Sequence, residues 1–332
     1  MIEFPNRLHL ARLPTPITRL QRFPLTGSAT QIWIKRDELT GTEVSGNKIR
    51  KLEFSLAEAQ EQGCDTVITC GGLQSNHCRS TAILCTRLGL QVHLVLRGEK
   101  PEQPEGNLLM DYLSGAEITY VSQHDWHGHE ELVKDLQQDY ATAGSKAFYI
   151  PIGASDEIGL WGYIAACEEL KQDFQSLDMT PDYIVTATGS GGTQGGLIVG
   201  IRVFEIPTKV LAFNVCDDAA YFDQKIRRDV TLWQQRYKTD FDVKKLAITT
   251  VEGYMGAGYG TASEAVFASI ALLARTDGLF LDPVYTGKAF HGMVSEIQKG
   301  DDGALPGARN VLFIHTGGLF GVFPQQQNFL FK

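Results

Sequence analysis

Residues 182–196 read DYIVTATGSGGTQGG and define a strand, a loop and a helix in succession. The apolar, β-branched run Tyr183–Ala187 predicts a buried strand, and a helical pattern begins near Gln194. The loop between them, residues 188–193, combines glycines with hydroxyl side chains. Glycines let the backbone approach an anion closely, and N–H groups at the start of a helix bind it. The stretch therefore predicts a phosphate site, with a plain tight turn as the alternative.

The same alternation of short β-branched runs and longer helical patterns continues along almost the whole chain. This pattern is typical of parallel βα units with helices on both faces of a sheet. We therefore predict an α/β fold with open, twisted, mostly parallel sheets covered by helices. The predicted strands are Ile32–Lys35, Thr66–Thr69, Val92–Leu96, Ile118–Val121, Phe148–Ile152, Tyr183–Ala187, Val210–Val215, Leu279–Leu281 and Val311–His315.

Length, charge and cysteine usage narrow the class of protein. The 332 residues suit about two domains, and 30 Lys and Arg against 39 Asp and Glu give a net charge of -9, which argues against a nucleic-acid partner. The chain contains no apolar run of the roughly 18 residues that span a bilayer, and its amino terminus lacks a signal-peptide pattern. We expect a cytoplasmic protein whose six cysteines, which form no CxxC pair, are free and mostly buried.

Two glycine-containing loops come close to nucleotide-binding motifs without matching them. In the phosphate loop, Gln194 stands where the dinucleotide fingerprint has a third glycine. In residues 41–50, GTEVSGNKIR, the lysine of a Walker A loop is displaced by one position and Ile49 replaces the magnesium-binding hydroxyl. Lys48 instead begins a predicted helix, whose positive end favours the neutral amine that forms Schiff bases. The alternative is a solvated surface lysine, which is what we expect for Lys51.

A third loop, residues 70–79, reads CGGLQSNHCR and follows a predicted strand. Gln74, Ser75, Asn76 and His77 bring polar groups to a strand-to-helix turn, which suits an anion such as a substrate carboxylate. Ser75 is a candidate nucleophile or proton carrier, although its spacing is not that of the G-x-S-x-G elbow of hydrolases. Helix capping by Ser75 or Asn76 is the alternative and is compatible with a functional role.

Three further segments carry polar side chains. The loops at residues 282–288 and 315–318 place hydroxyl groups and a phenol at the ends of predicted strands, and neither is decisive alone. The segment His124–Glu130 contains three histidines, but its spacing matches no structural zinc motif. We expect this segment to be an exposed loop leading into a helix, without a metal.

Five ordered motifs resemble those of the 1-aminocyclopropane-1-carboxylate deaminase/D-cysteine desulfhydrase family: SGNKIRKLE, GGLQSNHCRSTA, TGSGGTQGG, LDPVYTGKAFHGM and FIHTGG. They run from residue 45 to residue 318, so the resemblance covers nearly the whole chain. The family belongs to the fold-type II pyridoxal-phosphate enzymes of the tryptophan synthase β superfamily. The resemblance implies a small domain of residues 52–156 inserted into a large one of residues 1–51 and 157–332, and a homodimer.

The resemblance also implies roles for individual residues. Lys48 would form the Schiff base with pyridoxal phosphate, Asn76 would contact the 3′-hydroxyl of the cofactor, and Thr316 would face its pyridine nitrogen. The residues expected to hold the phosphate are Thr188, Gly189, Ser190, Gly191, Gly192 and Thr193. The residues expected to meet the substrate are Ser75, Gln74, His77, Tyr259, Tyr285 and Thr286, with Lys48, Ser75, Tyr259 and Tyr285 taking part in catalysis.

One departure from the family pattern bears on the substrate. Cyclopropane deaminases have a motif that resembles DPVYEG where this chain has DPVYTG, so that Thr286 replaces a glutamate. A carboxylate beside the ring nitrogen stabilises its protonated form and a strong electron sink, whereas a hydroxyl does so weakly. We therefore expect a D-cysteine desulfhydrase. The alternatives are a cyclopropane deaminase, elimination from another β-substituted amino acid such as cysteate or β-chloroalanine, and a non-catalytic protein that binds a phosphate ligand.

Overall fold

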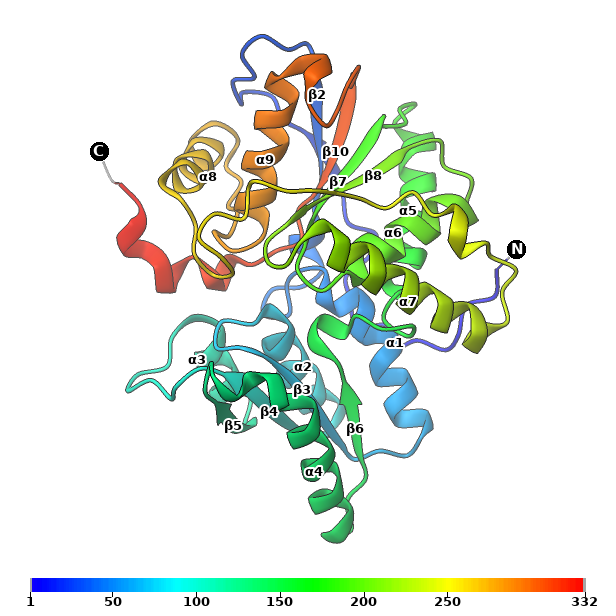
Figure 1. The fold of residues 1–332 in the computed structure, drawn as a ribbon, viewed down its shortest axis with the longest axis vertical. Helices are drawn as coiled ribbons and strands as arrows, with labels where there is room; N and C mark the ends of the chain where they lie inside the picture. Colours follow the sequence, from blue (N-terminus) through cyan, green and yellow to red (C-terminus); the bar gives the residue numbers. More distant parts are fainter. Residues whose placement is uncertain (1, 331–332) are drawn as a thin grey trace.

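The computed structural model describes residues 2–330, and the larger of its two sheets joins both ends of the chain (Figure 1). The strand order is β1-β2-β10-β7-β8-β9, with β1 antiparallel to β2 and all other pairs parallel. The strands are β1 (Ile17–Arg19), β2 (Gln31–Lys35), β7 (Tyr183–Thr188), β8 (Lys209–Asn214), β9 (Thr249–Val251) and β10 (Asn310–Ile314). The last strand thus lies between the second and the seventh.

The smaller sheet comes from one continuous part of the chain. It has the order β5-β4-β3-β6, and all its pairs are parallel. Its strands are β3 (Thr66–Gly72), β4 (Gln91–Arg97), β5 (Glu117–Val121) and β6 (Ala147–Ile150). In Figure 1 this sheet lies below the larger one, and the chain passes from one to the other through α1.

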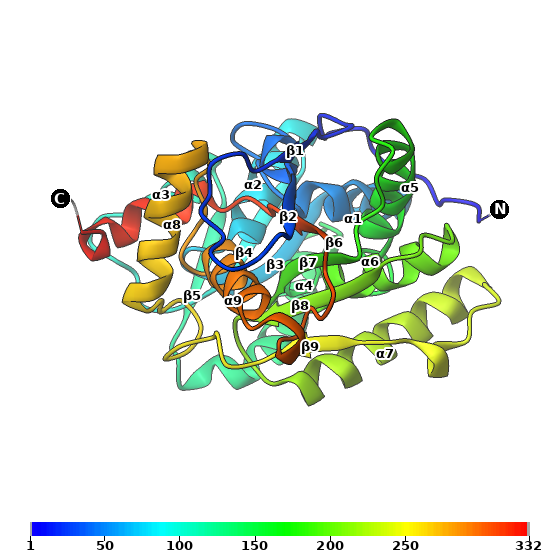
Figure 2. The same ribbon diagram turned by 90° about the horizontal axis from the view of Figure 1, so that it is seen from above.

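Helices cover both faces of each sheet (Figures 1 and 2). Hydrophobic clusters place α5, α6 and α7 on one face of the large sheet and α8 and α9 on the other. On the small sheet, α1, α2 and α3 cover one face and α4 the other. The bounds are α1 (Lys48–Glu61), α2 (Asn76–Leu88), α3 (Gly106–Leu113), α4 (His129–Thr142), α5 (Trp161–Ser176), α6 (Gly192–Val203), α7 (Ala219–Tyr237), α8 (Glu264–Asp277) and α9 (Thr286–Gln298).

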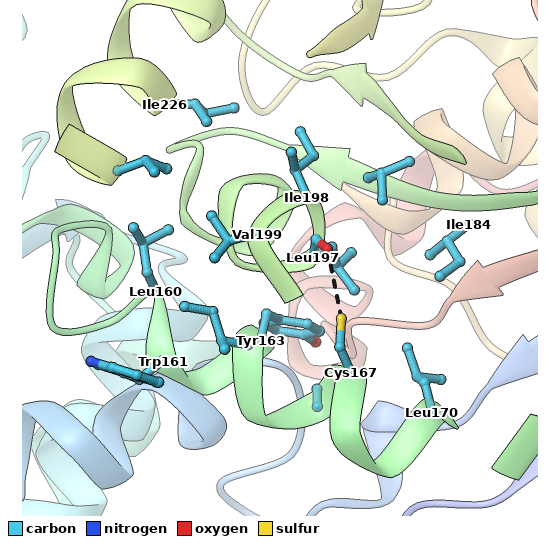
Figure 3. Packing of buried hydrophobic residues seen from close by; sticks show 14 of the residues in the cluster. Leu160, Trp161, Tyr163, Cys167, Leu170, Ile184, Leu197, Ile198, Val199 and Ile226 are labelled. Carbon is cyan, nitrogen blue, oxygen red and sulfur yellow. Dashed lines mark hydrogen bonds between the residues drawn. The ribbon is translucent and has the colours of Figure 1, made fainter. Parts of the chain in front are cut away.

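Helices α5 and α6 pack against each other in the hydrophobic core (Figure 3), and their contact depends on a glycine. A Cβ atom on Gly196 would lie 2.6 Å from Tyr163 Cβ and 2.7 Å from the Leu160 carbonyl oxygen. Next to this contact, Cys167 Sγ lies 3.6 Å from the carbonyl oxygen of Leu197. The absence of a side chain lets the two helices pack backbone to backbone, which fixes α6, and with it the phosphate loop at its start, against the core.

The predicted α/β fold is confirmed, and eight of the nine predicted strands are present with ends that differ by a few residues. The exception is Leu279–Leu281, which is an irregular connection. Leu279 and Leu281 are buried as expected, because they pack into the hydrophobic cluster between the large sheet and the helices α8 and α9. The short strands β1 and β9 escaped prediction. The domain boundaries stay a prediction, and the boundary proposed between residues 51 and 52 falls inside α1.

No helix within residues 2–330 is both long enough and apolar enough to cross a membrane. Five of the six cysteines are buried, Cys216 is half-buried, and all six are free.

Candidate active site

A cavity of about 660 Å³ lies where the carboxyl ends of strands from both sheets meet. Its wall includes residues that follow β3, β6, β7, β8 and β10. Carboxyl ends of parallel strands are the usual location of ligand sites in open α/β sheets. The sequence-predicted residues that line this cavity are Lys48, Ser75, Asn76, His77, Thr188, Gly189, Ser190, Gly191, Thr193, Tyr259, Tyr285 and Thr316.

Lys48 is the first residue of α1, and its amine lies within the cavity wall. Its Nζ donates a hydrogen bond to Asn47 Oδ1 at 3.2 Å and lies 5.8 Å from the centroid of the Tyr285 ring. Burial lowers the pKa of Lys48 to about 8; Asp282 opposes this shift, and Arg79 adds to it. The cause is therefore mainly desolvation and not the helix end that the sequence suggested. Near pH 8 about half of the amine is neutral, which is the nucleophilic form.

The glycine loop forms a cradle at the start of α6. Gly191 adopts a φ of 82°, a left-handed conformation that favours glycine, and α6 begins at Gly192, two residues before the predicted start. Thr188 Oγ1 is buried and has no hydrogen-bond partner among the described residues. Asn47 Nδ2 donates to Thr193 Oγ1 at 2.9 Å, which connects this loop to the residue before Lys48. The unpartnered hydroxyl and the N–H groups of α6 that follow Gly192 suit a phosphate.

Lys51 corrects an expectation, because it is buried and not a surface lysine: only 1% of its surface is exposed. Its Nζ donates to Ser155 Oγ at 3.2 Å, and that hydroxyl lies 2.8 Å from Ser190 Oγ in the glycine loop. Burial, together with the charges of Lys48 and Lys225, holds the pKa of Lys51 well below its usual value. Sequence reasoning missed Lys51 and Ser155; the available signal was that Lys51 follows Lys48 by one helical turn.

The turn before α2 serves both as a helix cap and as cavity wall. Ser75 is the N-cap of α2, and its Oγ accepts a hydrogen bond from the Cys78 N–H at 3.1 Å. His77 Nε2 lies 2.8 Å from Thr69 Oγ1, while its Nδ1 has no partner within residues 2–330. Burial and the charges of Lys48 and Lys51 hold the pKa of His77 well below its usual value. His77 is therefore neutral at physiological pH.

Two tyrosines and an arginine form another part of the cavity wall. The hydroxyl oxygens of Tyr259 and Tyr285 are 2.5 Å apart. Burial raises the pKa of Tyr259 to about 12 and that of Tyr285 well above its usual value, so both phenols are protonated. The guanidinium carbon of Arg97 lies 5.4 Å from the ring centroids of both Tyr259 and Trp126, which is within the range of cation–π attraction. This side of the cavity therefore offers proton donors.

Three predicted site residues are not part of the cavity wall, and each has a partner elsewhere. The Gln74 amide binds the start of α3: its Oε1 accepts from the Asn107 N–H at 2.9 Å, and its Nε2 donates to the Glu105 carbonyl at 3.0 Å. The Gly192 N–H donates to Ser155 Oγ at 3.2 Å. The fully buried Thr286 donates its hydroxyl to Asp282 Oδ1 at 2.6 Å. The Gln74 amide, the Gly192 N–H and the Thr286 hydroxyl are therefore already engaged within the protein and not free to meet a ligand.

Asp282 is surrounded by donors. Besides the Thr286 hydroxyl, its carboxylate accepts from the N–H groups of Val284, Tyr285 and Thr286, each at 2.8 Å. Each oxygen therefore accepts two hydrogen bonds, which uses the capacity of a carboxylate. The Thr286 hydroxyl in turn accepts from the Asp282 N–H at 2.8 Å. The loop before α9 is thus closed on itself and offers no free carboxylate.

Among residues 2–330 no group of three or more His, Cys, Asp or Glu side chains is arranged to hold a metal. In the segment His124–Glu130, His124 binds the neighbouring Asp125 carboxylate at 2.9 Å. His127 and His129 bind the backbone carbonyls of His124 and Trp126 at 2.9 and 2.7 Å. These histidines are therefore used within their own turn.

A buried, partly neutral lysine beside a phosphate cradle, between two sheets, is the arrangement that a pyridoxal-phosphate-dependent enzyme requires. A family model described as "pyridoxal-phosphate dependent enzyme" matches residues 8–317. The chain is therefore an enzyme of this class, and its cofactor is pyridoxal phosphate. Within the class it belongs to the family of the 1-aminocyclopropane-1-carboxylate deaminases and D-cysteine desulfhydrases, as the following relatives establish.

The chain is 41% identical over 323 residues to the mitochondrial bifunctional D-cysteine desulfhydrase/1-aminocyclopropane-1-carboxylate deaminase of Arabidopsis thaliana, covering 95% of this chain and 78% of that protein. It is 40% identical over 323 residues to a putative 1-aminocyclopropane-1-carboxylate deaminase of Thermotoga maritima, covering 97% and 99%. Among solved structures, the crystal structure of a 1-aminocyclopropane-1-carboxylate deaminase homologue superposes with a TM-score of 0.87 at 32% identity, covering 97% of this chain and 94% of that one. Membership of an enzyme family speaks against the non-catalytic alternative.

Proposed function

We propose that this chain is a D-cysteine desulfhydrase, which converts D-cysteine to pyruvate, hydrogen sulfide and ammonia. The observation that carries the proposal is the closed loop before α9. Thr286 stands where cyclopropane deaminases have a glutamate, its hydroxyl is committed to Asp282, and the Asp282 carboxylate is saturated. This loop therefore provides no free carboxylate for a protonated ring nitrogen. Loss of a good leaving group such as thiolate needs a weaker electron sink than opening a cyclopropane ring.

The residues that line the cavity supply binding and proton transfer. Pyridoxal phosphate supplies the electron sink when it is bound. The Thr188 hydroxyl and the loop N–H groups after it, apart from that of Gly192, hold the phosphate. Lys51 supports this loop by donating a hydrogen bond to Ser155, whose hydroxyl lies 2.8 Å from Ser190 Oγ. The turn at Ser75 receives the substrate carboxylate. These contacts orient the Cα–H bond of the substrate toward Lys48.

Proton movements follow from the pKa values. The neutral Lys48 amine takes the proton from Cα, since its pKa of about 8 leaves a useful fraction unprotonated. The Cβ–S bond then breaks, and the sulfur leaves with the bonding electrons. The Tyr259–Tyr285 pair lines the cavity with protonated phenols and would donate a hydrogen bond to the departing sulfur. The remaining aminoacrylate hydrolyses in water to pyruvate and ammonia.

The second candidate is the cyclopropane deaminase, which forms 2-oxobutanoate and ammonia. It is favoured by the similarity to the putative deaminase of Thermotoga maritima, while the Arabidopsis relative is named for both activities. Elimination from cysteate or another β-substituted amino acid is the remaining alternative. We also propose a homodimer, to be tested by the molar mass of the purified protein in solution.

A product assay separates these candidates. The purified enzyme is incubated with D-cysteine, L-cysteine, cysteate and the cyclopropane acid, and sulfide, sulfite, pyruvate and 2-oxobutanoate are measured. We expect sulfide and pyruvate in equal amounts from D-cysteine, at the highest rate of the four. Pyruvate from D-cysteine no faster than from the L-isomer, or 2-oxobutanoate formed fastest, would overturn the proposal.

The role of Lys48 is tested separately. We expect Lys48→Ala to lose the visible absorbance of pyridoxal phosphate bound covalently to a lysine, and to lose activity by more than about a thousandfold. Lys134→Ala is the matched control, because the Lys134 side chain is 68% exposed and lies on α4 away from the cavity wall. Retention of the visible band in Lys48→Ala would contradict the assignment.

A further inference from the structure

Arg79 is a fully buried cation beside the cavity, and it takes no part in the proposed reaction. It lies on α2, one turn after Asn76, and none of its surface is exposed. Among residues 2–330, no carboxylate oxygen lies within 4.0 Å of its guanidinium. The buried Asp111 carboxylate on α3 offsets part of this burial through space, since it opposes the lowering of the Arg79 pKa. A buried guanidinium without a direct ion pair is costly. Such a cost calls for an explanation in terms of what the guanidinium holds.

The guanidinium joins three segments that are distant in sequence. Its Nη1 donates to Asn107 Oδ1 at 2.9 Å and to Asn76 Oδ1 at 3.3 Å, and its Nη2 donates to the Ser45 carbonyl oxygen at 2.7 Å. The Phe320 ring covers it, with the ring centroid 4.8 Å from Cζ. Ser45 is three residues before Lys48, so Arg79 connects the lysine loop, the start of α2 and the start of α3.

These bonds fix which end of the Asn76 carboxamide faces the cavity. Asn76 Oδ1 accepts from Arg79 Nη1 and, at 3.1 Å, from Asn107 Nδ2. A guanidinium can only donate hydrogen bonds, so rotating the amide by 180° would bring the Asn76 NH₂ group against two donors. The Nδ2 atom has no hydrogen-bond partner among the described residues, and Asn76 lines the cavity. The cavity therefore meets a donor at this point.

We propose that Arg79 is a positioning residue that turns the Asn76 NH₂ group into the cavity and holds it at a fixed distance from the loop of Lys48. The proposal rests on the proposed function, because it takes the partner of Asn76 to be an oxyanion of the bound cofactor. A donor at fixed separation from the lysine selects a ligand that carries an oxygen anion next to the carbon that Lys48 attacks. The positive charge of Arg79 acts in the same direction, since it helps to keep the Lys48 amine neutral.

The test is a double-mutant cycle between Arg79 and Asn76 with cofactor affinity as the readout. Apoenzymes of wild type, Arg79→Met, Asn76→Ala and the double variant are titrated with pyridoxal phosphate, and the visible absorbance gives each Kd. We expect each single variant to weaken binding roughly tenfold, as for one lost hydrogen bond, and the double variant to be no weaker than Asn76→Ala alone. Arg87→Met, on the same helix and 44% exposed at its side chain, is the control and should leave the Kd unchanged.

A second measurement separates positioning from general damage to the fold. In the holoenzymes, the pH at which the visible band changes should shift in the same direction in Arg79→Met and Asn76→Ala, while Arg79→Lys should recover part of the Kd because it keeps a donor and the charge. If Arg79→Met does not fold, Asn107→Ala takes its place in the cycle, because it removes one donor to Asn76 and one acceptor of Arg79.

Independent, multiplying effects of the two substitutions, or an unchanged Kd in Arg79→Met, would overturn the proposal. If the wild-type enzyme fails to release sulfide from D-cysteine while the cycle is non-additive, the proposed substrate is wrong and the role of Arg79 stands. The two failures are therefore distinguishable.

Discussion

Replacing Thr286 by glutamate tests the closed loop before α9, from which the substrate proposal derives. The Thr286 hydroxyl is 2.6 Å from Asp282 Oδ1, and both residues are buried. A glutamate at this position carries a second carboxylate to within about 4 Å of the first. Two unit charges at that distance repel by about 4 kcal/mol at an effective dielectric constant near 20. The variant should therefore lose about that much stability beyond the cost of its larger volume.

Thr286→Gln is the matched control, because it has almost the same volume and no charge. Overpacking and the lost hydroxyl lower the stability of both variants, whereas charge repulsion lowers only that of the glutamate variant. We expect the melting temperature at pH 8 to be roughly 8 °C lower for the glutamate variant than for the glutamine variant, at on the order of 2 °C per kcal/mol for a chain of this size. The assay is thermal unfolding followed by circular dichroism.

The pH dependence of this difference has a defined sign. The neighbouring carboxylate raises the pKa of the introduced glutamate in the folded state above its unfolded value of about 4.3. A raised folded pKa means that stability is retained at low pH and lost as the pH rises through the folded pKa. The gap should therefore shrink from about 4 kcal/mol at pH 8 to about 1 kcal/mol at pH 5. Equal melting temperatures of the two variants at pH 8 would refute the reasoning, because the new carboxylate would then lie away from Asp282.

Two further outcomes follow from other parts of the structure. Gly196→Ala should destabilise the enzyme by about 1–3 kcal/mol in urea unfolding, because the added Cβ would lie 2.7 Å from the Leu160 carbonyl oxygen. The control Gly128→Ala, whose Cβ would meet no atom within 4 Å, should change stability by less than about 0.5 kcal/mol. Equal effects of the two substitutions would contradict the packing of α5 on α6. The rate at which the apoenzyme takes up pyridoxal phosphate should rise with pH around a midpoint of about 8, because the neutral Lys48 amine is the reactive form. Stopped-flow absorbance measures this rate. A midpoint near the pKa of a free lysine would contradict the burial of this amine.

The parts of the fold that sequence predicts best are those with a strong local signal. The strand Tyr183–Thr188 is buried on both faces, so its apolar run is continuous, and the glycines after it mark the loop without ambiguity. Lys48 could be identified because a Gly-Asn turn and a helix start surround it. In contrast, β1 and β9 are three residues long and carry too little pattern to be recognised. The Leu279–Leu281 run has the apolar pattern of a strand, but its burial comes from packing in the cluster of α8 and α9, which only the tertiary structure determines.

The site residues divide in the same way. Gln74 and Thr286 belong to motifs that resemble a known family, yet their side chains are engaged with Asn107 and Asp282, partners that sequence does not reveal. Lys51 has the charge of a surface residue and is buried because its neighbours on α1 pack between two sheets. Arg79 escaped notice because the two partners that link it to other segments are 28 and 34 residues away along the chain. Sequence thus identifies the residues that line the cavity more readily than those that position them.

The place of β10 between β2 and β7 has a consequence for the order in which the protein forms during translation. The four-stranded sheet is complete once residue 150 has been made, whereas the six-stranded sheet lacks its middle strand until residues 310–314 emerge. At about 5–20 residues per second, that interval lasts roughly ten to thirty seconds. During this time β2 and β7 have no partner between them. Pairing across the centre of the large sheet therefore begins only once residues 310–314 have emerged, whereas the small sheet can already be complete.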